Sequence, residues 1–385
     1  MSGTVYLDHN ATTPIRPAAL DAMTEAAKAV GNPSSVHAPG RAARGRMEAA
    51  RRQVAALLDR PAEQVVFTSG GTEADALAIR GCGRPRLLVS AVEHDAVLAA
   101  AEGAERIAVD AEGRLDLADL ERRLAASDEP ALVSVMWVNN ETGVVQPVAE
   151  AVRLAHAAGA LIHLDAVQGA GKLDPAALDG ADLIALSAHK LGGPMGSGAL
   201  LVRPAVALRA VAVGGGQERG RRSGTENLPG IAGFGAAAEA VLADGRHELD
   251  RARCLRDRLE AAMLGAAPEA RVLGAGADRI ATTCLGLPGV PAETQVMALD
   301  LAGVAVSAGS ACSSGKVRRS HVLAAMLGDD PLAGEAIRVS LGWTTAESDI
   351  ERFLSAWRAM RDRLSPSARN KSDLVLPDPV LKEPR

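Results

Sequence analysis

A hydroxyl, an imidazole and an amine follow one another closely near the middle of the chain. The apolar run Leu183-Ile184-Ala185-Leu186 leads into Ser187, His189 and Lys190, and the glycine-rich stretch Leu191–Gly196 comes next. An apolar run of this length, bounded by glycine and proline, is typical of a buried strand. A lysine at the end of such a strand is partly desolvated, which lowers the pKa of its amine. A neutral amine forms a Schiff base with an aldehyde, so the stretch predicts a site for pyridoxal 5'-phosphate, although a lysine that marks a strand's exit into water fits it as well.

Two glycines join a second strand-like run to a helical pattern in Ser69-Gly70-Gly71-Thr72-Glu73. Free backbone N–H groups and the positive end of a helix dipole make such a junction a site for an anion, and Thr72 adds a hydroxyl. The stretch is not a P-loop, because no Gly-Lys-Ser/Thr follows. It predicts a phosphate site around Gly71 and Thr72, with a well-capped helix as the alternative.

A carboxylate stands at the end of a third run, Leu161–Asp165. Pyridoxal phosphate needs an acid beside its pyridine nitrogen, because the ion pair keeps that nitrogen protonated and the ring then acts as an electron sink. Asp165 suits this role, Gln168 could donate to the phenolate oxygen, and His94 could stack on the ring face. The alternative for Asp165 is an ordinary helix N-cap.

Small residues surround Cys312 on both sides, in Ser307-Ala308-Gly309-Ser310-Ala311-Cys312-Ser313-Ser314-Gly315. Cys284, by contrast, lies among larger apolar residues, as buried cysteines usually do. A thiol on a mobile loop of small residues can enter a site and react there, so Cys312 is a candidate nucleophile. An incidental surface thiol is the alternative.

Strand-like runs alternate with helical patterns through the first two thirds of the chain. This alternation predicts an α/β fold with a mostly parallel, doubly wound sheet covered by helices. Ligands of such sheets lie beyond the carboxyl ends of the strands, which is where the polar residues named above occur. The expected strands are Val65–Ser69, Arg86–Ala91, Arg106–Asp110, Ala131–Val138, Leu161–Ala166, Leu183–Ala188 and Ala199–Arg203.

The rest of the chain predicts a smaller α+β domain and a tail. We expect a large domain over 12–245, a small domain made of 1–11 and 246–364, and a mobile tail over 365–385, which is polar and proline-rich. The expected strands of the small domain are Ala281–Leu287, Val304–Ala308 and Ala336–Leu341, and its helices Glu293–Ala302 and Ala346–Leu364. Two helices, Pro17–Val30 and Pro39–Arg60, are expected near the start of the chain.

Composition narrows the class of protein. The chain has 385 residues, 48% of them hydrophobic, and a net charge of -5, which suits a soluble globular protein and gives no support to DNA binding. Its first residues lack a signal-peptide pattern, and no apolar run approaches the ~20 residues of a membrane span. Four cysteines without C-x-x-C spacing indicate neither a disulfide framework nor a zinc site, so we expect a cytoplasmic protein without a metal.

Taken together, these motifs resemble those of the cysteine desulfurases of the NifS/IscS group, in the class-V aminotransferase family of fold-type I pyridoxal phosphate enzymes. The resemblance runs from Tyr6-Leu7-Asp8 to Ile337–Gly342. The motifs that carry it, in chain order, are Asn-Ala-Thr-Thr-Pro, Thr-Ser-Gly-Gly-Thr-Glu, Glu-His, Asn-Asn-Glu-Thr-Gly, Asp-Ala-Val-Gln, Ser-Ala-His-Lys, Arg-Ser-Gly-Thr and Gly-Ser-Ala-Cys.

The resemblance implies a role for each motif residue. Lys190 would hold the cofactor, Asp165 would pair with the pyridine nitrogen and Gln168 with the ring oxygen, and His94 would stack on the ring and assist proton transfer. The residues expected to bind the cofactor's phosphate are Gly71, Thr72, Ser187 and His189, with Thr225 reaching it from the other subunit of a homodimer.

It also implies the reaction. Asn140, beside the cofactor, and Arg338 would hold the carboxylate of L-cysteine, for which a bidentate guanidinium is well suited. Cys312 would take the sulfur of the substrate as a persulfide, and the rest of the substrate would leave as L-alanine. The sulfur would then pass to an acceptor protein in the synthesis of iron–sulfur clusters, thiolated tRNA or a cofactor. The length of the segment after Cys312 suits direct delivery to a scaffold, but the basic Lys316–Arg319 stretch departs from the family pattern and leaves the acceptor open.

Three other functions remain possible on the sequence. A relative that acts on selenocysteine or cysteine sulfinate is disfavoured by the long Cys312 segment. A catalytically silent regulatory partner would have no need for Lys190, Asp165, His94 and Cys312 together, and a general aminotransferase would give Cys312 no role.

Overall fold

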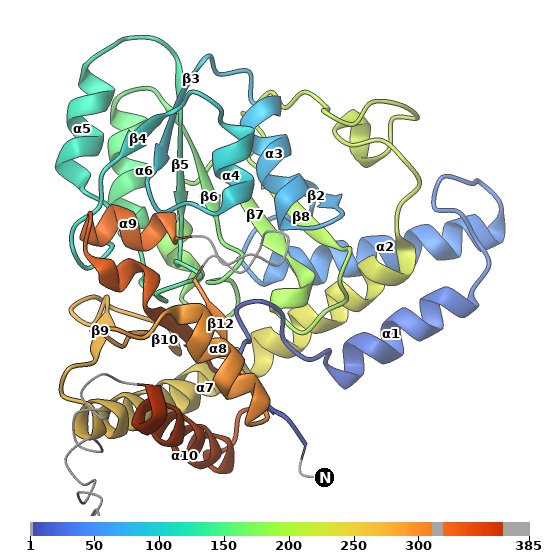
Figure 1. The fold of residues 1–385 in the computed structure, drawn as a ribbon. Helices are drawn as coiled ribbons and strands as arrows, with labels where there is room; N and C mark the ends of the chain where they lie inside the picture. The colour runs from blue at the N-terminus through green and yellow to red at the C-terminus, as the bar shows by residue number, and fades with distance from the viewer. Residues whose placement is uncertain (1–2, 310–318, 365–385) are drawn as a thin grey trace, which may run out of the picture.

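The computed structural model describes residues 3–309 and 319–364, and its largest element is a seven-stranded sheet (Figure 1). The strand order is β2-β8-β7-β6-β5-β3-β4. β8 runs antiparallel to both of its neighbours, and the other pairs are parallel, which confirms the mostly parallel sheet predicted above. The strands are β2 (Val65–Thr68), β3 (Arg86–Ser90), β4 (Glu105–Ile107), β5 (Ala131–Met136), β6 (Leu161–Asp165), β7 (Leu183–Ser187) and β8 (Gly198–Val202).

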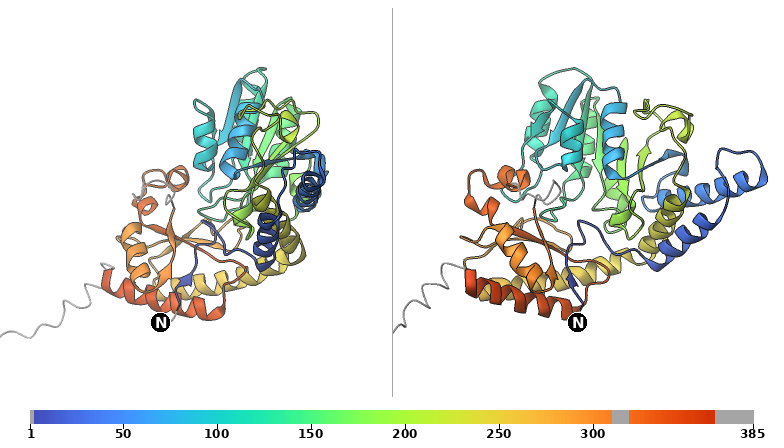
Figure 2. Two further views of the ribbon diagram at one scale, coloured as in Figure 1. Left: turned by 90° about the vertical axis from the view of Figure 1, so that its right-hand side faces the viewer. Right: turned by 45° about the vertical axis from the view of Figure 1, so that its right-hand side comes forward.

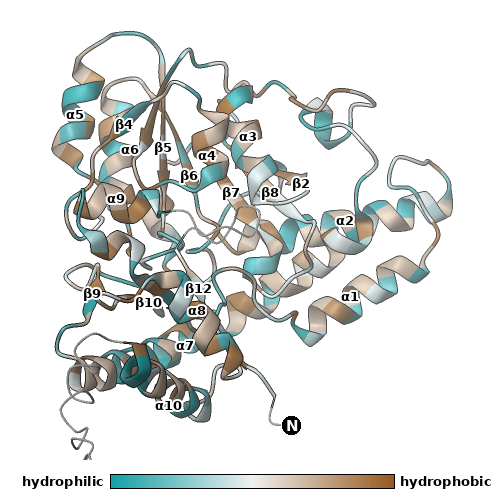
Figure 3. Cartoon of the chain, viewed as in Figure 1, coloured by the Kyte–Doolittle hydropathy of each residue, from teal (hydrophilic) through white to brown (hydrophobic). Residues whose placement is uncertain are grey.

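Both faces of this sheet are apolar, because helices cover both. In β7, Leu183 and Ala185 pack in the cluster that includes α3 (Gly71–Gly81), whereas Ile184 and Leu186 pack with residues of α2 (Ala38–Ala56). The alternation has the two-residue period of a strand, and burial on both sides turns it into a continuous apolar run. The hydropathy colouring shows the same pattern, with apolar strands inside and polar residues on the outer helix faces (Figure 3).

Further helices complete the two layers around the large sheet. α1 (Pro17–Lys28) packs with α2 against the long helix α7 (Leu228–Ala266), and α4 (Asp95–Ala100) lies beside α3. α5 (Leu117–Ala125) and α6 (Val148–Ala157) pack against each other at the other end of the sheet (Figure 1).

A second, antiparallel sheet with the order β12-β13-β10-β9 lies below the first (Figures 1 and 2). α7 runs from the large sheet to this region, where it contacts α10. The expected domain boundary at residue 245 falls inside α7, and it stays a prediction. The elements of this region are β9 (Arg271–Leu273), β10 (Thr282–Gly286), α8 (Ala292–Leu301), β12 (Ser307–Ala308), α9 (His321–Leu327), β13 (Ala336–Ser340) and α10 (Glu347–Leu364).

The N-terminal segment connects the two sheets. β1 (Val5–Tyr6) pairs with β11 (Val304–Ala305) in the second region. Farther along, the backbone N–H of Thr13 donates to the carbonyl of His189, beyond the end of β7. The residues between them therefore bridge the small sheet and the stretch that carries Lys190.

The structure corrects several details of the sequence prediction. Val304–Ala308 is not one strand, because β11 pairs with β1 and β12 pairs with β13. The first helix ends at Lys28 rather than Val30, since Ala29 leaves the helical conformation. The short elements β9 and α9 were not predicted, because three to seven residues carry little periodic signal. No helix within the described ranges is long and apolar enough to cross a membrane.

A buried ion pair fixes the loop before α7 to the sheet. The guanidinium of Arg51 donates to both carboxylate oxygens of Glu218, at 2.7 and 2.9 Å, and Glu218 also accepts from the backbone N–H of Phe67. Their side chains are 5% and 2% exposed. Loss of Glu218 would leave the buried guanidinium with only Glu48, whose side chain is 39% exposed, as a counter-charge.

We predict that Glu218→Gln lowers the free energy of unfolding by about 3 kcal/mol, because the buried guanidinium of Arg51 then keeps only the more exposed Glu48 as a counter-charge. Urea unfolding measures this loss. Glu25→Gln is the control, because Glu25 forms an exposed pair with Lys28, and it should leave the midpoint unchanged. Equal midpoints for all three proteins would contradict the prediction.

Candidate active site

A cavity lies where strand ends of the large sheet, the start of α3 and the N-terminal segment meet β13 of the second sheet. Its lining contains every site residue predicted from the sequence except Thr225 and Cys312. Those residues are Gly71, Thr72, His94, Asn140, Asp165, Gln168, Ser187, His189, Lys190 and Arg338.

The anion site predicted at the first glycine pair forms the start of a helix. α3 begins at Gly71, directly beyond β2, so the N–H groups of its first turn are open to the cavity wall. A Cβ on Gly71 would lie 3.0 Å from the side chain of Val167, so any larger residue there would require Val167 to shift. Glu73 accepts from Arg222 and from the backbone N–H of Ser69, so its own charge is compensated.

Ser187 and His189 face the same end of the cavity from the end of β7. His189 Nδ1 lies 3.2 Å from Thr12 Oγ1. Burial and the neighbouring Lys190 lower the pKa of His189 to about 4, so its imidazole is neutral at pH 7 and can offer one N–H to an anion.

Asp165 lies at the last position of β6 and is 6% exposed. Its Oδ1 accepts from the backbone N–H of Val167. Burial, and then the carboxyl of Asp75, raise the pKa of Asp165 to about 6. Glu93 is buried nearby and its pKa is also raised, by burial first and then by Asp165. A site with this much buried acid favours a cationic group at the position that Asp165 faces.

Gln168 and His94 frame the middle of the cavity. Gln168 Nε2 donates to the carbonyl of Asn10, and its buried Oε1 has no hydrogen-bond partner among the described residues. His94 caps α4, and its Nδ1 accepts from the backbone N–H of Ala96. Since Nδ1 accepts, the proton of the neutral ring is on Nε2.

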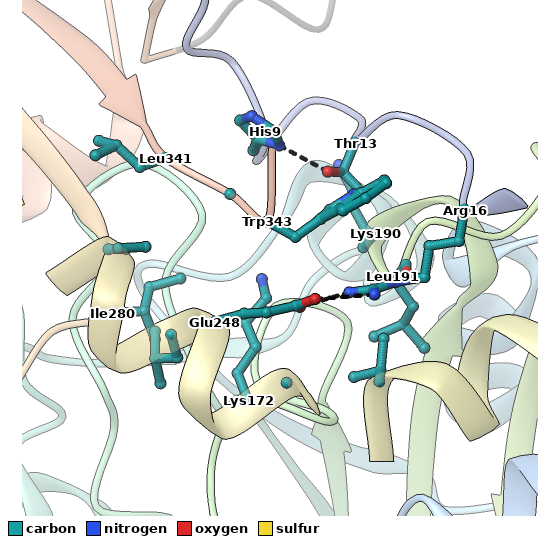
Figure 4. Close-up of a pocket in the computed structure, with 16 residues that line it drawn as sticks. His9, Thr13, Arg16, Lys172, Lys190, Leu191, Glu248, Ile280, Leu341 and Trp343 are labelled. Carbon is teal, nitrogen blue, oxygen red and sulfur yellow. Dashed lines mark hydrogen bonds and ion pairs between the residues drawn. The ribbon is translucent and has the colours of Figure 1, made fainter. Parts of the chain in front are cut away.

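Lys190 lines both this cavity and a second one, which is drawn in Figure 4. Its Nζ donates to the carbonyls of Asn10 and Ala11, the latter at 2.7 Å. The second cavity also contains Lys172, whose pKa is lowered to about 8 by burial and by the charge of Lys190. Two amines so placed disfavour each other's charged form.

Arg338 reaches the cavity from β13. It donates to Asp8 Oδ1 at 2.7 Å and to the carbonyl of Asn140 at 3.2 Å. Its Nε is buried and has no acceptor in the described part of the chain. The guanidinium is therefore fixed in place and still has hydrogen-bonding capacity, as a carboxylate site requires.

Sequence reasoning missed five residues of the lining: Asn10, Ala11, Asp75, Met136 and Val167. Asn10 is central, because its backbone accepts from Lys190 and Gln168 while its side-chain amide donates to Thr282 and to the carbonyl of Asn140. The motif around Asn10 was visible in the sequence, but only the fold brings it to Lys190.

Thr225 and Cys312 are not part of this lining. Thr225 lies in a neighbouring hollow with Phe67, Glu218 and Asn227, and its expected action across a subunit boundary stays a prediction. Cys312 and residues 316–318 of the basic stretch lie outside the described residues, as does the expected tail.

Pyridoxal phosphate fits the chemistry of this donor set. The cavity lining combines the first turn of α3, whose N–H groups suit an anion, with the buried carboxylate of Asp165, which favours a cation, and with the amine of Lys190. The unpartnered Oε1 of Gln168 marks an amide whose polar atoms are available to a ligand.

Comparisons with known proteins agree with this site. Residues 5–353 match the model of the family "Aminotransferase class-V". A cysteine desulfurase of Cereibacter sphaeroides is 48% identical over 94% of this chain and 96% of its own length, and one of Klebsiella pneumoniae is 42% identical over 94% and 93%. The X-ray structure of a NifS-like protein from Rickettsia africae superimposes with a TM-score of 0.86 at 33% identity, covering 93% of this chain and 99% of that one. The chain belongs to the class-V aminotransferase family and, within it, to the cysteine desulfurases.

Proposed function

We propose that this protein is a pyridoxal phosphate enzyme that converts L-cysteine to L-alanine and holds the released sulfur as a persulfide on Cys312. The observation that supports it best is the cavity itself, where an anion site, a buried carboxylate, a lysine and an arginine from two different sheets lie around one space. The similarity to cysteine desulfurases over most of the chain names the substrate.

The cofactor would be held by residues along the length of the cavity. The start of α3 with Thr72 would bind the phosphate, and Lys190 would form the covalent link. Asp165 would pair with the pyridine nitrogen. When bound there, pyridoxal phosphate supplies an electron sink for the bonds at the substrate's Cα.

Arg338 would orient the substrate. A bidentate contact between its guanidinium and the carboxylate of cysteine fixes the amino acid at the border between the two sheets. The main-chain carbonyl of Asn140 and the carboxylate of Asp8 already hold Arg338, which limits the side-chain entropy lost on binding. Arg338 thereby sets which bond of the substrate faces Lys190.

Lys190 would also move a proton. Its amine, once released from the cofactor, is the base that we assign to the Cα proton. Lys172, in the second cavity, disfavours a second positive charge and so favours the neutral amine that a base requires. His94, with its proton on Nε2, is a second proton donor at the cavity wall.

The sulfur step would belong to Cys312. Its thiolate attacks the substrate sulfur, an S–S bond forms, and the Cβ–S bond breaks with its electron pair going to Cβ. Protonation of Cβ then gives alanine. We further propose that the enzyme is a cytoplasmic homodimer, with Thr225 acting across the subunits, and that it passes the sulfur to an acceptor protein of iron–sulfur cluster, tRNA or cofactor synthesis.

The experiment that tests this function measures L-alanine released from L-cysteine with a thiol reductant present. We expect release by the wild type and almost none by Cys312→Ser, because the serine hydroxyl cannot accept sulfur. Cys254→Ser is the matched control, since Cys254 is an exposed thiol, and it should keep wild-type activity. Equal release by all three proteins would overturn the role of Cys312, and no release by the wild type loaded with cofactor would overturn the substrate.

Borohydride reduction tests the covalent link. After reduction, peptide mass spectrometry should find the cofactor on Lys190 in the wild type and no linked peptide in Lys190→Ala. Lys172→Met is the control, because it removes the neighbouring amine and should leave the link in place. A linked peptide that contains residue 172 in the Lys190→Ala protein would move the Schiff base to the other lysine.

Arg338→Gln should raise the KM for L-cysteine about 10- to 100-fold, because hydrogen bonds between charged groups contribute roughly 1.5–3 kcal/mol. Steady-state kinetics measures the change. Cofactor affinity should change little in this variant, since Arg338 is assigned to the substrate. An unchanged KM would show that the carboxylate is bound elsewhere.

A further inference from the structure

Three buried polar side chains, those of Asp75, His163 and Ser134, lie next to one another near Asp165. Asp75, on α3, is 2% exposed, and His163 and Ser134, on the neighbouring strands β6 and β5, are fully buried. Asp75 Oδ1 lies 3.5 Å from His163 Nε2, and His163 Nδ1 lies 2.9 Å from Ser134 Oγ. Neither Asp75 Oδ1 nor His163 Nε2 has a hydrogen-bond partner of ordinary geometry among the described residues, so each is the nearest polar atom available to the other.

The titratable groups around Asp75, His163 and Ser134 are mainly acidic. The carboxyls of Asp165 and Glu93 are buried in the same region, and the pKa of each is raised, by burial first and then by a neighbouring carboxyl. His94 and Lys190 face the same cavity, and Arg106 acts on Glu93. Burial raises the pKa of Asp75 to about 8 and lowers that of His163 to about 4. The imidazole therefore supplies no positive charge to balance an ionised Asp75 at pH 7.

We propose that Asp75 is a protonated carboxyl that donates a hydrogen bond to His163 Nε2, so that His163 Nδ1–H donates to Ser134 Oγ, and that its lack of charge leaves Asp165 ionised. The inference rests on the proposed function in one respect, namely that Asp165 pairs with a pyridine nitrogen. It adds a proton assignment for a residue of the cavity lining to which the proposed function gives no role.

The assignment has a consequence for Asp165. Two ionised carboxylates in one buried space raise each other's pKa, so an ionised Asp75 would favour protonation of Asp165. A neutral Asp75 leaves Asp165 as the group that carries the negative charge. Carboxylic acids kept neutral by an apolar site are an established way for proteins to place a hydrogen-bond donor at neutral pH.

Unfolding of the cofactor-free protein tests the proton directly. The unfolded chain ionises Asp75 above about pH 4, whereas the folded protein keeps the proton until about pH 8. Between these values unfolding releases this proton. The ratio of unfolded to folded wild type, relative to Asp75→Asn, should therefore rise about tenfold per pH unit, and level off above pH 8. Parallel pH profiles for the two proteins would overturn the proposal.

Asp119→Asn is the matched control, because Asp119 is also a buried aspartate, but it accepts hydrogen bonds from Arg123 and from the backbone N–H of Ala108, and its pKa is lowered. The unfolded-to-folded ratio of the wild type relative to this variant should not rise with pH. If Asp75→Asn does not fold, carbon-13 NMR of the wild type labelled at aspartate carboxyls replaces the comparison. At pH 7 a resonance of a protonated aspartic acid is expected, and its absence would overturn the proposal.

Cofactor binding separates this inference from the proposed function. Asp75→Asn should bind pyridoxal phosphate within about threefold of the wild type, while Asp165→Asn should lose at least about tenfold, as for the loss of a charged hydrogen bond. An equal loss in both variants would mean that Asp75 is ionised and would overturn the inference alone. Failure of the wild type to bind the cofactor would overturn the proposed function, and the unfolding profile would still decide the state of Asp75.

Discussion

The buried carboxylate of Asp165 is the constraint on which the rest of the site depends. It is 6% exposed and has Asp75 and Glu93 as acidic neighbours. Burial of an anion is unfavourable unless a positive charge or hydrogen bonds compensate it, and here one backbone N–H donates to it. A protonated pyridine nitrogen would supply the missing charge.

The arrangement of the two sheets determines where a substrate would bind relative to Asp165. The large sheet holds Asp165 and Lys190, the small sheet holds Arg338, and the N-terminal segment joins them through the backbone of Asn10. A ligand held at both ends by the large sheet would therefore present its middle to Arg338. The substrate carboxylate is assigned to Arg338 of the small sheet and proton transfer to Lys190, which follows a strand of the large sheet. Helix α7 runs between the two regions (Figure 2).

Much of this site could be predicted because its residues follow strand ends. Asp165, Ser187 and Lys190 each come at or just after a buried apolar run, and a parallel sheet brings such ends together. Asp75 could not be predicted, because it lies inside a helix and its depth depends on how α3 packs on β6. The ion pair of Arg51 with Glu218 joins residues far apart in sequence, so no local pattern reveals it.

The most direct test of the charge on Asp165 compares two cofactors that differ in one ring atom. The affinity of the cofactor-free protein is measured for pyridoxal phosphate and for its analogue with a CH group in place of the ring nitrogen. The wild type should prefer pyridoxal phosphate by about 10- to 100-fold, and Asp165→Asn should bind both alike. Equal affinities in the wild type would contradict the account, because the buried carboxylate would then not be paired with the ring.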